Sequence, residues 1–277
     1  MELYDSVAYE ASKRLTLSYS TSFGISSRLL GKSIRPHIYA IYGLVRIADE
    51  IVDTYKGIDA RQLLDDLESE TVAAIQRGYS TNPIVHAFAL TAAKYAIEQS
   101  LITPFFASMR MDLIPRLYDP KEYEQYIHGS AEVVGLMCLK VFCDNDSKKY
   151  NDLQSGAAAL GSAYQKVNFL RDMAADYTQL GRLYFPNVTY ETFDEAAKQS
   201  IVNDIKNDFT KARVAIKSLP SSSRKATMTS LVYYNDLLQK LERTPVATLK
   251  STRIRLPSRR KAALLLRSML NEGKNYG

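Results

Sequence analysis

Apolar residues recur every three or four positions along most of this chain, which is the spacing of amphipathic helices. No segment alternates convincingly between apolar and polar residues with the period of two that a half-buried strand requires. Proline residues separate the periodic segments and mark helix starts and ends. The pattern predicts an all-α chain, with a first helix that begins near residue 4 and further helices over residues 37–55, 65–77, 82–99, 104–118, 123–142, 150–177, 194–217 and 223–243.

The helix expected at 150–177 carries a polar stripe on one face. Gln165, Asn168, Asp172 and Asp176 follow one another at steps of three, four and four, and the opposite face is apolar. That apolar face comprises Leu160, Ala163, Val167, Leu170 and Ala174. Carboxylates four residues apart repel each other by about 0.2–0.5 kcal/mol on an exposed helix, and by more where water is excluded. We therefore expect a metal ion or a basic side chain between them, although a solvated polar face explains this helix equally well when it is taken alone.

A second helix of the same kind is expected at 37–55. Its polar stripe consists of Tyr42, Arg46, Asp49 and Asp53, and its core stripe of Ile38, Ile41, Val45, Ala48 and Val52. One Asp–x–x–x–Asp pair means little, but two pairs on amphipathic helices, each with an Arg close by, are much less easily accidental. Oxygen ligands without His or Cys suit Mg²⁺ better than Zn²⁺, so the two helices together predict a magnesium site.

Three further features carry candidate chemistry. A cluster of hydroxyl residues around Ser20–Ser27 either ends the first helix or donates hydrogen bonds to phosphate oxygens. The basic tail, residues 252–270, is either a solvated helix, a phosphate clamp through Arg253 or Lys261, or a membrane-facing patch. His128 has no second His at ligand spacing, so a structural role is expected for it.

Composition narrows the class of protein. The chain has 277 residues, which we interpret as a single domain over 1–277, and its formal net charge of +6 favours anionic partners. No stretch of Lys and Arg is interleaved with aromatic residues, so we expect no nucleic-acid partner. Cys138 and Cys143 are predicted to be reduced thiols, as in a cytosolic protein. The N-terminus does not resemble a secretory signal and no apolar run approaches 18 residues, so we expect a cytoplasmic protein, peripheral to a membrane at most.

Four segments together resemble the squalene/phytoene synthase family. They are Ser20-Thr21-Ser22-Phe23, Arg46-x-x-Asp49-Glu50-x-x-Asp53, Gln165-x-x-Asn168-x-x-Arg171-Asp172-x-x-x-Asp176 and Arg182-x-Tyr184-Phe185-Pro186. Their order and spacing match that family from about residue 15 to residue 265. Each segment is unspecific by itself, but the combination is highly specific. Within the family the chain is most similar to the bacterial phytoene synthases, with the dehydrosqualene synthases close behind.

The resemblance implies an isoprenoid-synthase fold, a class I terpenoid synthase-like helical bundle around a central cavity. It also implies roles for individual residues. Asp49, Asp53, Asn168 and Asp172 would hold Mg²⁺, with Mn²⁺ as an alternative and with Asp176 in support. The residues implied to contact diphosphate are Ser20, Ser22, Arg46, Gln165, Arg171, Arg253 and Lys261, and Tyr42 and Tyr233 would line the same mouth. The implied catalytic set is Arg46, Asp49, Asp53, Arg171, Asp172 and Asp176.

The implied reaction joins two prenyl diphosphates head to head through a cyclopropylcarbinyl diphosphate. We expect geranylgeranyl diphosphate as substrate and phytoene as product, without NADPH; farnesyl diphosphate, giving dehydrosqualene or squalene, is the alternative. A non-catalytic branch of the family serves as an assembly factor and has lost motif acids, whereas both acid pairs stand here. Chain elongases and cyclases usually carry Asp-Asp-x-x-Asp, whereas this chain has Asp49-Glu50-x-x-Asp53.

One position departs from the family pattern. Members often have Val-Ala-Gly-x-Val-Gly where this chain has Ser130-Ala131-Glu132-Val133-Val134-Gly135. Glu132 therefore replaces a Gly expected to lie close to the substrate or to a neighbouring helix, which concerns the shape of the pocket rather than the metal chemistry.

Overall fold

The computed structural model describes residues 2–20, 24, 26–55, 57–114, 117–180, 183–257, 259–260 and 263, without the side chains of residues 179 and 180. Within these ranges the chain is helical, and its β-structure is limited to one isolated bridge between Leu117 and Leu183. The α-helices are α1 (Glu2–Tyr19), α3 (Arg35–Asp49), α4 (Ala60–Arg77), α5 (Pro83–Tyr95), α6 (Gln99–Asp112), α7 (Pro120–Ile127), α8 (Val133–Cys143), α9 (Ser147–Leu180), α10 (Glu195–Lys217), α11 (Ser221–Arg243) and α12 (Val246–Leu249). Two π-helical turns, η1 (Glu50–Thr54) and η2 (His128–Glu132), interrupt this series. The all-α prediction is confirmed.

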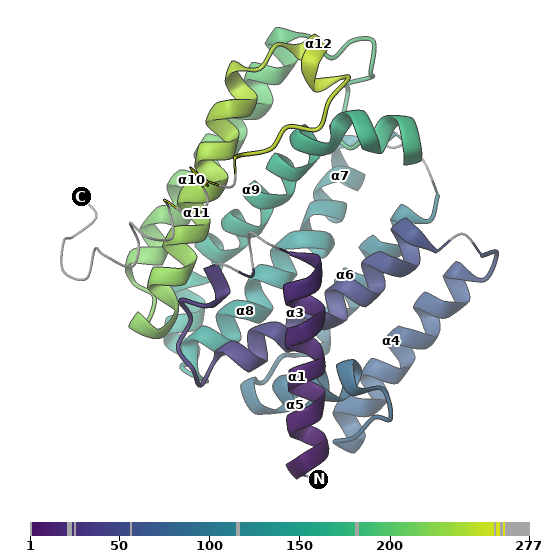
Figure 1. Ribbon diagram of the computed structural model, residues 1–277, viewed down its shortest axis with the longest axis vertical. Helices are drawn as coiled ribbons and strands as arrows, with labels where there is room; N and C mark the ends of the chain where they lie inside the picture. The colour runs from purple at the N-terminus through teal and green to yellow at the C-terminus, as the bar shows by residue number, and fades with distance from the viewer. Residues whose placement is uncertain are drawn as a thin grey trace.

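The helices form two groups that meet along α8 and α9 (Figure 1). One hydrophobic core lies among α9, α10 and α11 and includes Val167, Leu170 and Leu237, none of which is exposed. The other lies among α3, α5, α6 and α8, around Phe88 and Phe106. The long helix α9 therefore belongs to the first core, while its partner α8 contributes to the second.

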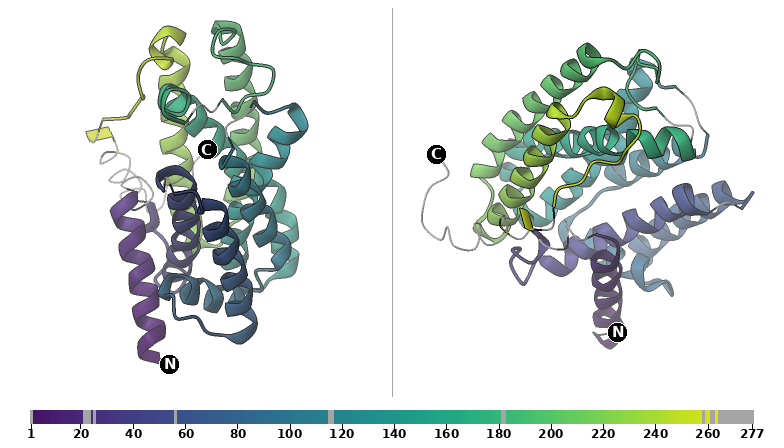
Figure 2. Two further views of the ribbon diagram at one scale, coloured as in Figure 1. Left: turned by 90° about the vertical axis from the view of Figure 1, so that its right-hand side faces the viewer. Right: turned by 45° about the horizontal axis from the view of Figure 1, so that its top comes forward.

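The chain after α12 returns across the bundle. Figures 1 and 2 show residues 250–257 lying over α9. The hydroxyl of Tyr190 donates to the Lys250 carbonyl at 2.6 Å, and Lys240 donates to the Arg255 carbonyl at 2.7 Å. Ile254, 7% exposed, is buried between these two contacts. This segment, which we call the strap (Lys250–Pro257), is thus fixed at both ends and brings Arg253 to the second acidic helix.

Both core stripes predicted from the sequence are confirmed. Ile38, Ile41, Ala48 and Val52 of the first acidic helix are buried, and so are Ala163, Val167, Leu170 and Ala174 of the second. The other two members, Val45 and Leu160, are half-buried. The amphipathic period therefore predicted correctly which face of each acidic helix is buried.

Some predicted boundaries were wrong. The helix expected at 37–55 ends as an α-helix at Asp49 and continues as the π-turn η1, and the helix expected at 123–142 contains the π-turn η2. The helix expected to begin at Pro104 begins at Gln99 and contains Pro104. At η2 a tertiary contact accompanies the change: a Cβ atom on Gly129 would lie 2.1 Å from the Pro104 carbonyl oxygen, so the two backbones are in direct contact. Pro115, for which a kink was considered, lies outside the described residues.

The continuous helical segment Pro120–Cys143 is unusually apolar. In length and mean hydropathy, 1.3 over its most apolar window, it resembles a membrane-crossing helix. Half of that window is buried inside the fold, and its middle packs against α6 and α9. Within the described residues it is thus placed as a core helix of the bundle.

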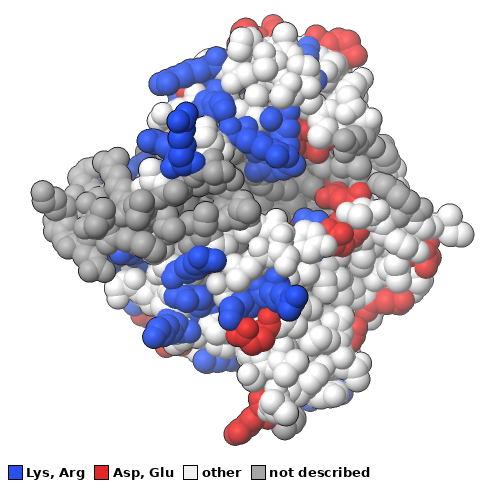
Figure 3. All heavy atoms as spheres, in the orientation of Figure 1, with Lys and Arg blue, Asp and Glu red and all other residues white. Residues whose placement is uncertain are grey.

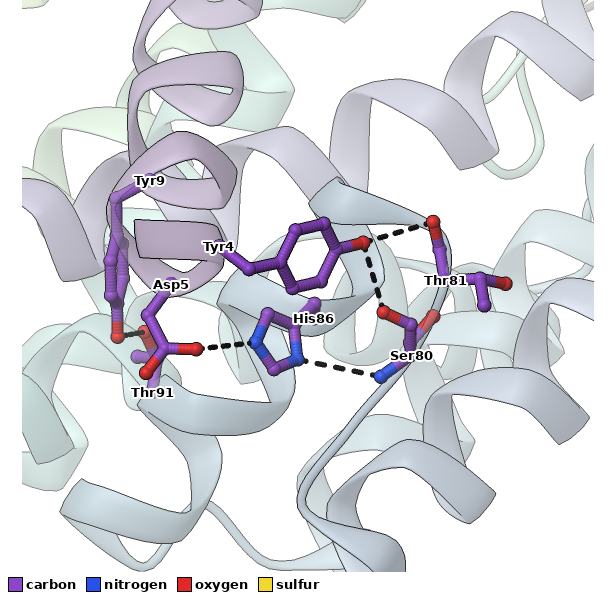
Figure 4. Close-up of polar contacts among 7 residues, drawn as sticks. All are labelled: Tyr4, Asp5, Tyr9, Ser80, Thr81, His86 and Thr91. Atoms are coloured by element: carbon purple, nitrogen blue, oxygen red, sulfur yellow. Dashed lines mark hydrogen bonds and ion pairs between the residues drawn. The ribbon is translucent and has the colours of Figure 1, made fainter. Parts of the chain in front are cut away.

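Helix α1 is attached to the α4–α5 connection by a polar cluster (Figure 4). Asp5 accepts a hydrogen bond from the fully buried His86 ring at 2.8 Å, and the other ring nitrogen accepts from the backbone N–H of Ser80. The Tyr4 hydroxyl reaches the carbonyl oxygens of Ser80 and Thr81 at 3.0 and 2.9 Å. These contacts satisfy a buried imidazole on both sides, which is the condition for burying it at low free-energy cost.

The second buried imidazole in this region, His37, predicts a pH effect on stability. Its ring contacts Thr91 at 3.0 Å and Tyr9 at 3.1 Å, while Lys94 lies 3.3 Å from the opposite nitrogen. Burial, and then the Lys94 charge, lower the pKa of His37 from 6.5 to about 4. Because the unfolded chain takes up this proton at a higher pH than the folded one, stability is complete near neutrality and falls as the pH drops from 6.5 towards 4.

We expect the His37 contribution to lower the free energy of unfolding by roughly 2 kcal/mol between pH 7.5 and pH 5. Urea titrations of the wild type and of His37→Gln at both pH values measure it, since the variant lacks the titrating group. Equal pH slopes for the two proteins would contradict the assignment.

Candidate functional site

A cavity of about 320 Å³ lies between α8, α9 and α11 and is closed on a third side by residues 26–38. One end is polar and the remainder apolar. The polar end, which we call the mouth, is lined by Ser130, Gln165, Asn168, Tyr233 and Tyr234. The far end is lined by Phe142, Leu153, Gly156, Ala215, Ile216 and Leu219. The expected central cavity is therefore present, and the second acidic helix forms one of its walls.

Small residues bring the cavity walls close together. A Cβ atom on Gly135 would lie 2.8 Å from the Ala157 carbonyl oxygen, and one on Gly161 would lie 2.4 Å from the Ala131 carbonyl oxygen. The unexpected Glu132 does not line the cavity; its carboxylate pairs with His128 at 3.0 Å. Gly161 on α9 permits the close approach of the two helices from the opposite side. The structural role expected for His128 stays a prediction.

Asp172 lies between two guanidinium groups. Arg171 reaches its two carboxylate oxygens at 2.9 and 2.5 Å, and Arg253 of the strap reaches them at 2.7 and 3.2 Å. Burial alone would lower the pKa of Arg171, but the contact with Asp172 outweighs it and raises that pKa. Of the two partners that the sequence allowed for this carboxylate, a metal or a basic side chain, the structure contains the basic one. The guanidinium groups of Arg171 and Arg253 are placed to bind a second anion beside Asp172.

The side chain of Asn168 has a carbonyl oxygen that makes no hydrogen bond. Its Oδ1 atom is buried and makes no hydrogen bond, while its amide contacts the Tyr234 hydroxyl. A buried acceptor that makes no hydrogen bond costs about 1–3 kcal/mol. An oxygen with this environment beside Asp172, one turn along the same helix face, is suited to a cation.

The first acidic motif spans the junction of α3 and η1. Arg46 forms an ion pair with Glu50 and lies 3.9 Å from Asp49, and its guanidinium stacks over the Tyr19 ring at 4.3 Å. Asp53 follows on the π-turn and is exposed. A π-turn adds a residue to the helical repeat and is frequent at functional sites. It changes the relative direction of Asp49 and Asp53 from that of a regular helix.

Asp49 is the most perturbed acid of the site. Burial and then the charge of Asp53 raise its pKa to about 8, with smaller contributions from Asp112 and Glu50, while Arg46 opposes the rise. A carboxyl group whose ionisation is opposed by burial and then by a neighbouring carboxylate marks a place where a cation would be stabilised. Asp112 itself is buried at the end of α6 and accepts hydrogen bonds from Tyr126 at 2.7 Å and Tyr184 at 3.3 Å.

Two tyrosines connect the acidic helices across the mouth. Tyr42 of α3 hydrogen-bonds to Ser20 and interacts electrostatically with Asp49 and with Tyr234. Tyr234 of α11 interacts in turn with Arg171 and Asp172. Burial raises the pKa of both hydroxyls, so they stay protonated and can donate. These two tyrosines therefore link the first acidic motif to the second, and Tyr234 also lines the polar end of the cavity.

The oxygen donors of the two acidic motifs fit Mg²⁺, and each motif by itself forms an incomplete site. Among the described residues, no three Asp, Glu, His or Cys side chains converge tightly enough to hold an ion by themselves. Each motif offers two oxygen donors instead, Asp49 with Asp53 and Asn168 with Asp172. Mg²⁺ is commonly held by one or two carboxylates together with substrate phosphates and water. The donor set thus suits a metal that binds together with a phosphorylated substrate.

The other residues predicted for the site lie at the mouth, on α9 or outside the described residues. The Gln165 amide donates to Ser130 at 3.4 Å at the mouth, and Tyr233 lines the cavity beside Tyr234. Asp176 lies one turn beyond Asp172 on α9, half-buried. Ser22 and Lys261 lie outside the described residues. Figure 3 shows one face of the molecule: Lys and Arg side chains gather on both sides of its middle, and Asp and Glu side chains lie toward one end.

Sequence reasoning missed Tyr234, Ser130 and Asp112. Tyr234 follows Tyr233 and lies four residues after Ser230, which also lines the cavity, so a polar stripe on α11 was a usable signal. Asp112 ends an otherwise apolar helix, and an acid in such a position is a candidate for a buried partner. Ser130 gave no signal of its own, because small residues occur at helix contacts everywhere.

The chain is similar in sequence and in fold to known proteins. The family model for squalene/phytoene synthase matches residues 17–260. The phytoene synthase of Arthrospira platensis is 28% identical over 85% of this chain and 84% of its own length. The 15-cis-phytoene synthase of Synechococcus elongatus is 26% identical over 96% of this chain and 93% of its own length. The crystal structure of a dehydrosqualene synthase in complex with a ligand superimposes with a TM-score of 0.80 at 20% identity, covering 96% of both chains.

Proposed function

Because this chain belongs to the squalene/phytoene synthase family, whose named relatives transfer prenyl groups, we propose that it joins two geranylgeranyl diphosphates head to head to form phytoene. The observation that carries this proposal is the apolar cavity whose polar end contains Gln165, Asn168 and Tyr234, with Tyr234 interacting with Asp172 and with Tyr42 of the first acidic helix. A diphosphate head group and a hydrocarbon tail require that combination, and intact motif acids argue against a non-catalytic role.

The length of the cavity favours the C20 substrate. From Asn168 at the mouth to Leu153 at the far end, the cavity follows α9 for about fifteen residues, or about 22 Å at the helical rise. At roughly 1.2 Å per bond, the advance of an extended polypeptide, the main chain of a C20 prenyl group spans about 18 Å and that of a C15 group about 13 Å. The shorter chain would leave apolar wall uncovered, at about 0.8 kcal/mol for each methylene not buried.

The first chemical step would ionise the allylic C–O bond and leave negative charge on the departing diphosphate. Arg46, Arg171 and Arg253 stand at the mouth and would stabilise that charge as it develops. The Tyr42 and Tyr234 hydroxyls, which stay protonated, would donate to the same oxygens. Bound Mg²⁺, held by Asp49, Asp53, Asn168 and Asp172 with support from Asp176, would supply Lewis-acid stabilisation of the leaving group.

The walls of the cavity would protect the carbocation that remains. The double bond of the second substrate would attack it, and loss of a proton would close the ring of the cyclopropylcarbinyl diphosphate. Loss of the second diphosphate, rearrangement and loss of a second proton would then give the central double bond. Apolar residues such as Leu139, Phe142 and Leu160 line this space and exclude water, which would otherwise capture either cation. Cys138 also lines it, but burial raises the pKa of this thiol to about 12, so it stays neutral and a poor nucleophile.

Product analysis tests the proposal. We expect purified protein with Mg²⁺ to convert geranylgeranyl diphosphate to phytoene, with NADPH making no difference to the product mass. Parallel reactions contain farnesyl diphosphate, where dehydrosqualene or squalene would identify the C15 alternative. A control with EDTA should abolish turnover. Absence of any condensation product from either substrate would contradict the enzymatic function, and a faster reaction with the C15 substrate would contradict the substrate assignment.

The cytoplasmic location and the peripheral membrane association stay predictions from the sequence.

A further inference from the structure

The cavity is closed at its far end by a thin wall. Leu153, Gly156 and Ala215 line the cavity and also line a separate hollow on the protein surface. That outer hollow is polar on its other sides, where Lys148, Lys149, Lys211 and Asp152 surround it. One layer of side chains therefore separates the apolar interior from the surface at this end of α9.

Within this wall the backbones of α9 and α10 lie close together. A Cβ atom on Gly156 would lie 2.2 Å from the Cβ atom of Ala215, so that contact is closed by the two helices themselves. Leu153 is the largest of the three shared residues, and it is 6% exposed. The volume that blocks the cavity at this end is consequently the volume of the Leu153 side chain.

We propose that Leu153 sets the upper limit on the length of the prenyl chain that the cavity accepts. The inference rests on the proposed function and deepens it, because it locates the specificity of the same site. A C25 chain has a main chain of about 23 Å at roughly 1.2 Å per bond, which takes up the whole of the roughly 22 Å between Asn168 and Leu153 and brings the chain end against the wall. Removal of the Leu153 side chain would join the cavity to the outer hollow and extend the space along the direction of the chain.

The test compares two leucines of the same helix. Leu153→Ala opens the wall, whereas Leu160→Ala widens the cavity halfway along, since Leu160 lines the cavity but not the outer hollow. We expect Leu153→Ala to raise the ratio of kcat/KM for the C25 diphosphate to kcat/KM for the C20 diphosphate at least about tenfold. Leu160→Ala should leave that ratio within about twofold. An unchanged ratio in Leu153→Ala, or an equal rise in Leu160→Ala, would overturn the proposal.

A binding measurement makes the test independent of catalysis. Saturated n-alkyl diphosphates cannot form an allylic cation, so their affinity, measured by calorimetry, reports on the cavity alone. In the wild type we expect the affinity to rise about fourfold per methylene and to level off once the chain reaches the wall. In Leu153→Ala the plateau should move to longer chains, and a plateau that does not move would refute the role of Leu153.

These two readouts separate the inference from the function beneath it. If the plateau moves but no diphosphate is condensed, the wall is correctly placed and the proposed function is wrong. If condensation occurs and neither the ratio nor the plateau changes, the function stands and Leu153 does not limit chain length. Should Leu153→Ala fail to fold, as judged by circular dichroism, Leu153→Val shortens the same side chain by one carbon and is expected to shift both readouts in the same direction.

Discussion

Replacing Asp172 or Asp49 by Asn is expected to lower turnover at least ~100-fold, which is the typical loss when one strong electrostatic stabiliser is removed from an active site. Asp172 is the carboxylate that Arg171 and Arg253 both contact, and Asp49 is the acid whose pKa is raised to about 8 by burial and then by the charge of Asp53. An amide keeps the shape of each side chain but removes its charge, so a bound cation would lose one anionic ligand.

The variants need a control for general effects of the substitution. Asp66→Asn changes an exposed Asp on α4 that belongs to neither motif and whose partner is Gln62. Initial rates at saturating Mg²⁺ and substrate measure the effect, and circular dichroism checks that all three variants fold. Near-normal turnover in both Asp49→Asn and Asp172→Asn would reject the assignment of the site.

The second large effect is expected on stability, at a buried ion pair behind the cavity. Lys166 of α9 contacts Asp208 at 2.8 Å and Asp204 at 2.5 Å, and Ser162 donates to Asp208 at 3.0 Å. The side chains of Lys166 and Asp208 are each 11% exposed. Lys166→Met removes the cation and leaves Asp208 buried and uncompensated, so we expect a loss of about 3–5 kcal/mol in the free energy of unfolding.

Two comparisons make this prediction specific. Lys166→Met combined with Asp208→Leu removes both charges and should recover most of the loss, because an apolar pair can replace a buried ion pair. Lys206→Met breaks the more exposed pair with Glu242, on the opposite face of α10, and should cost at most about 1 kcal/mol. Urea titration measures all four proteins, and equal losses for Lys166→Met and Lys206→Met would contradict the buried-pair account.

The ion pair matters for the site because it fixes α9 against α10. Lys166 lies between Gln165 and Asn168, which face the mouth, and its own side chain points to the opposite helix. A slip of α9 by one residue would rotate the polar stripe away from the cavity. The stability of this contact and the geometry of the second acidic motif are thus connected through one helix.

The sequence predicted those parts of the fold that local periodicity controls. The buried stripes of both acidic helices repeat every three or four residues, and burial of that face is what holds an amphipathic helix in a bundle. The placement of Gln165 and Asn168 at the cavity followed from the same argument, since the face opposite the core has to point elsewhere. The resemblance to a known family then supplied the chemistry that the pattern alone left open.

Other parts depend on contacts between distant segments, which a local pattern does not contain. The π-turn η2 places Gly129 against the Pro104 carbonyl of another helix, and neither residue signals this by itself. Arg253 is 81 residues from Asp172 in sequence and reaches it because the strap returns across α9. The far wall of the cavity combines Leu153 with Ala215 of α10 and was likewise beyond sequence reasoning.

The central claim is that the two acidic motifs hold one diphosphate through divalent cations, and an anomalous difference map tests it most directly. Crystals would be grown with Mn²⁺ and a geranylgeranyl thiolodiphosphate, whose C–S bond resists ionisation, and measured at the manganese edge. We predict anomalous peaks beside Asp49 and Asp53 and beside Asn168 and Asp172, with the diphosphate between them and the hydrocarbon in the cavity. A diphosphate bound without manganese, or manganese at one motif only, would contradict the account.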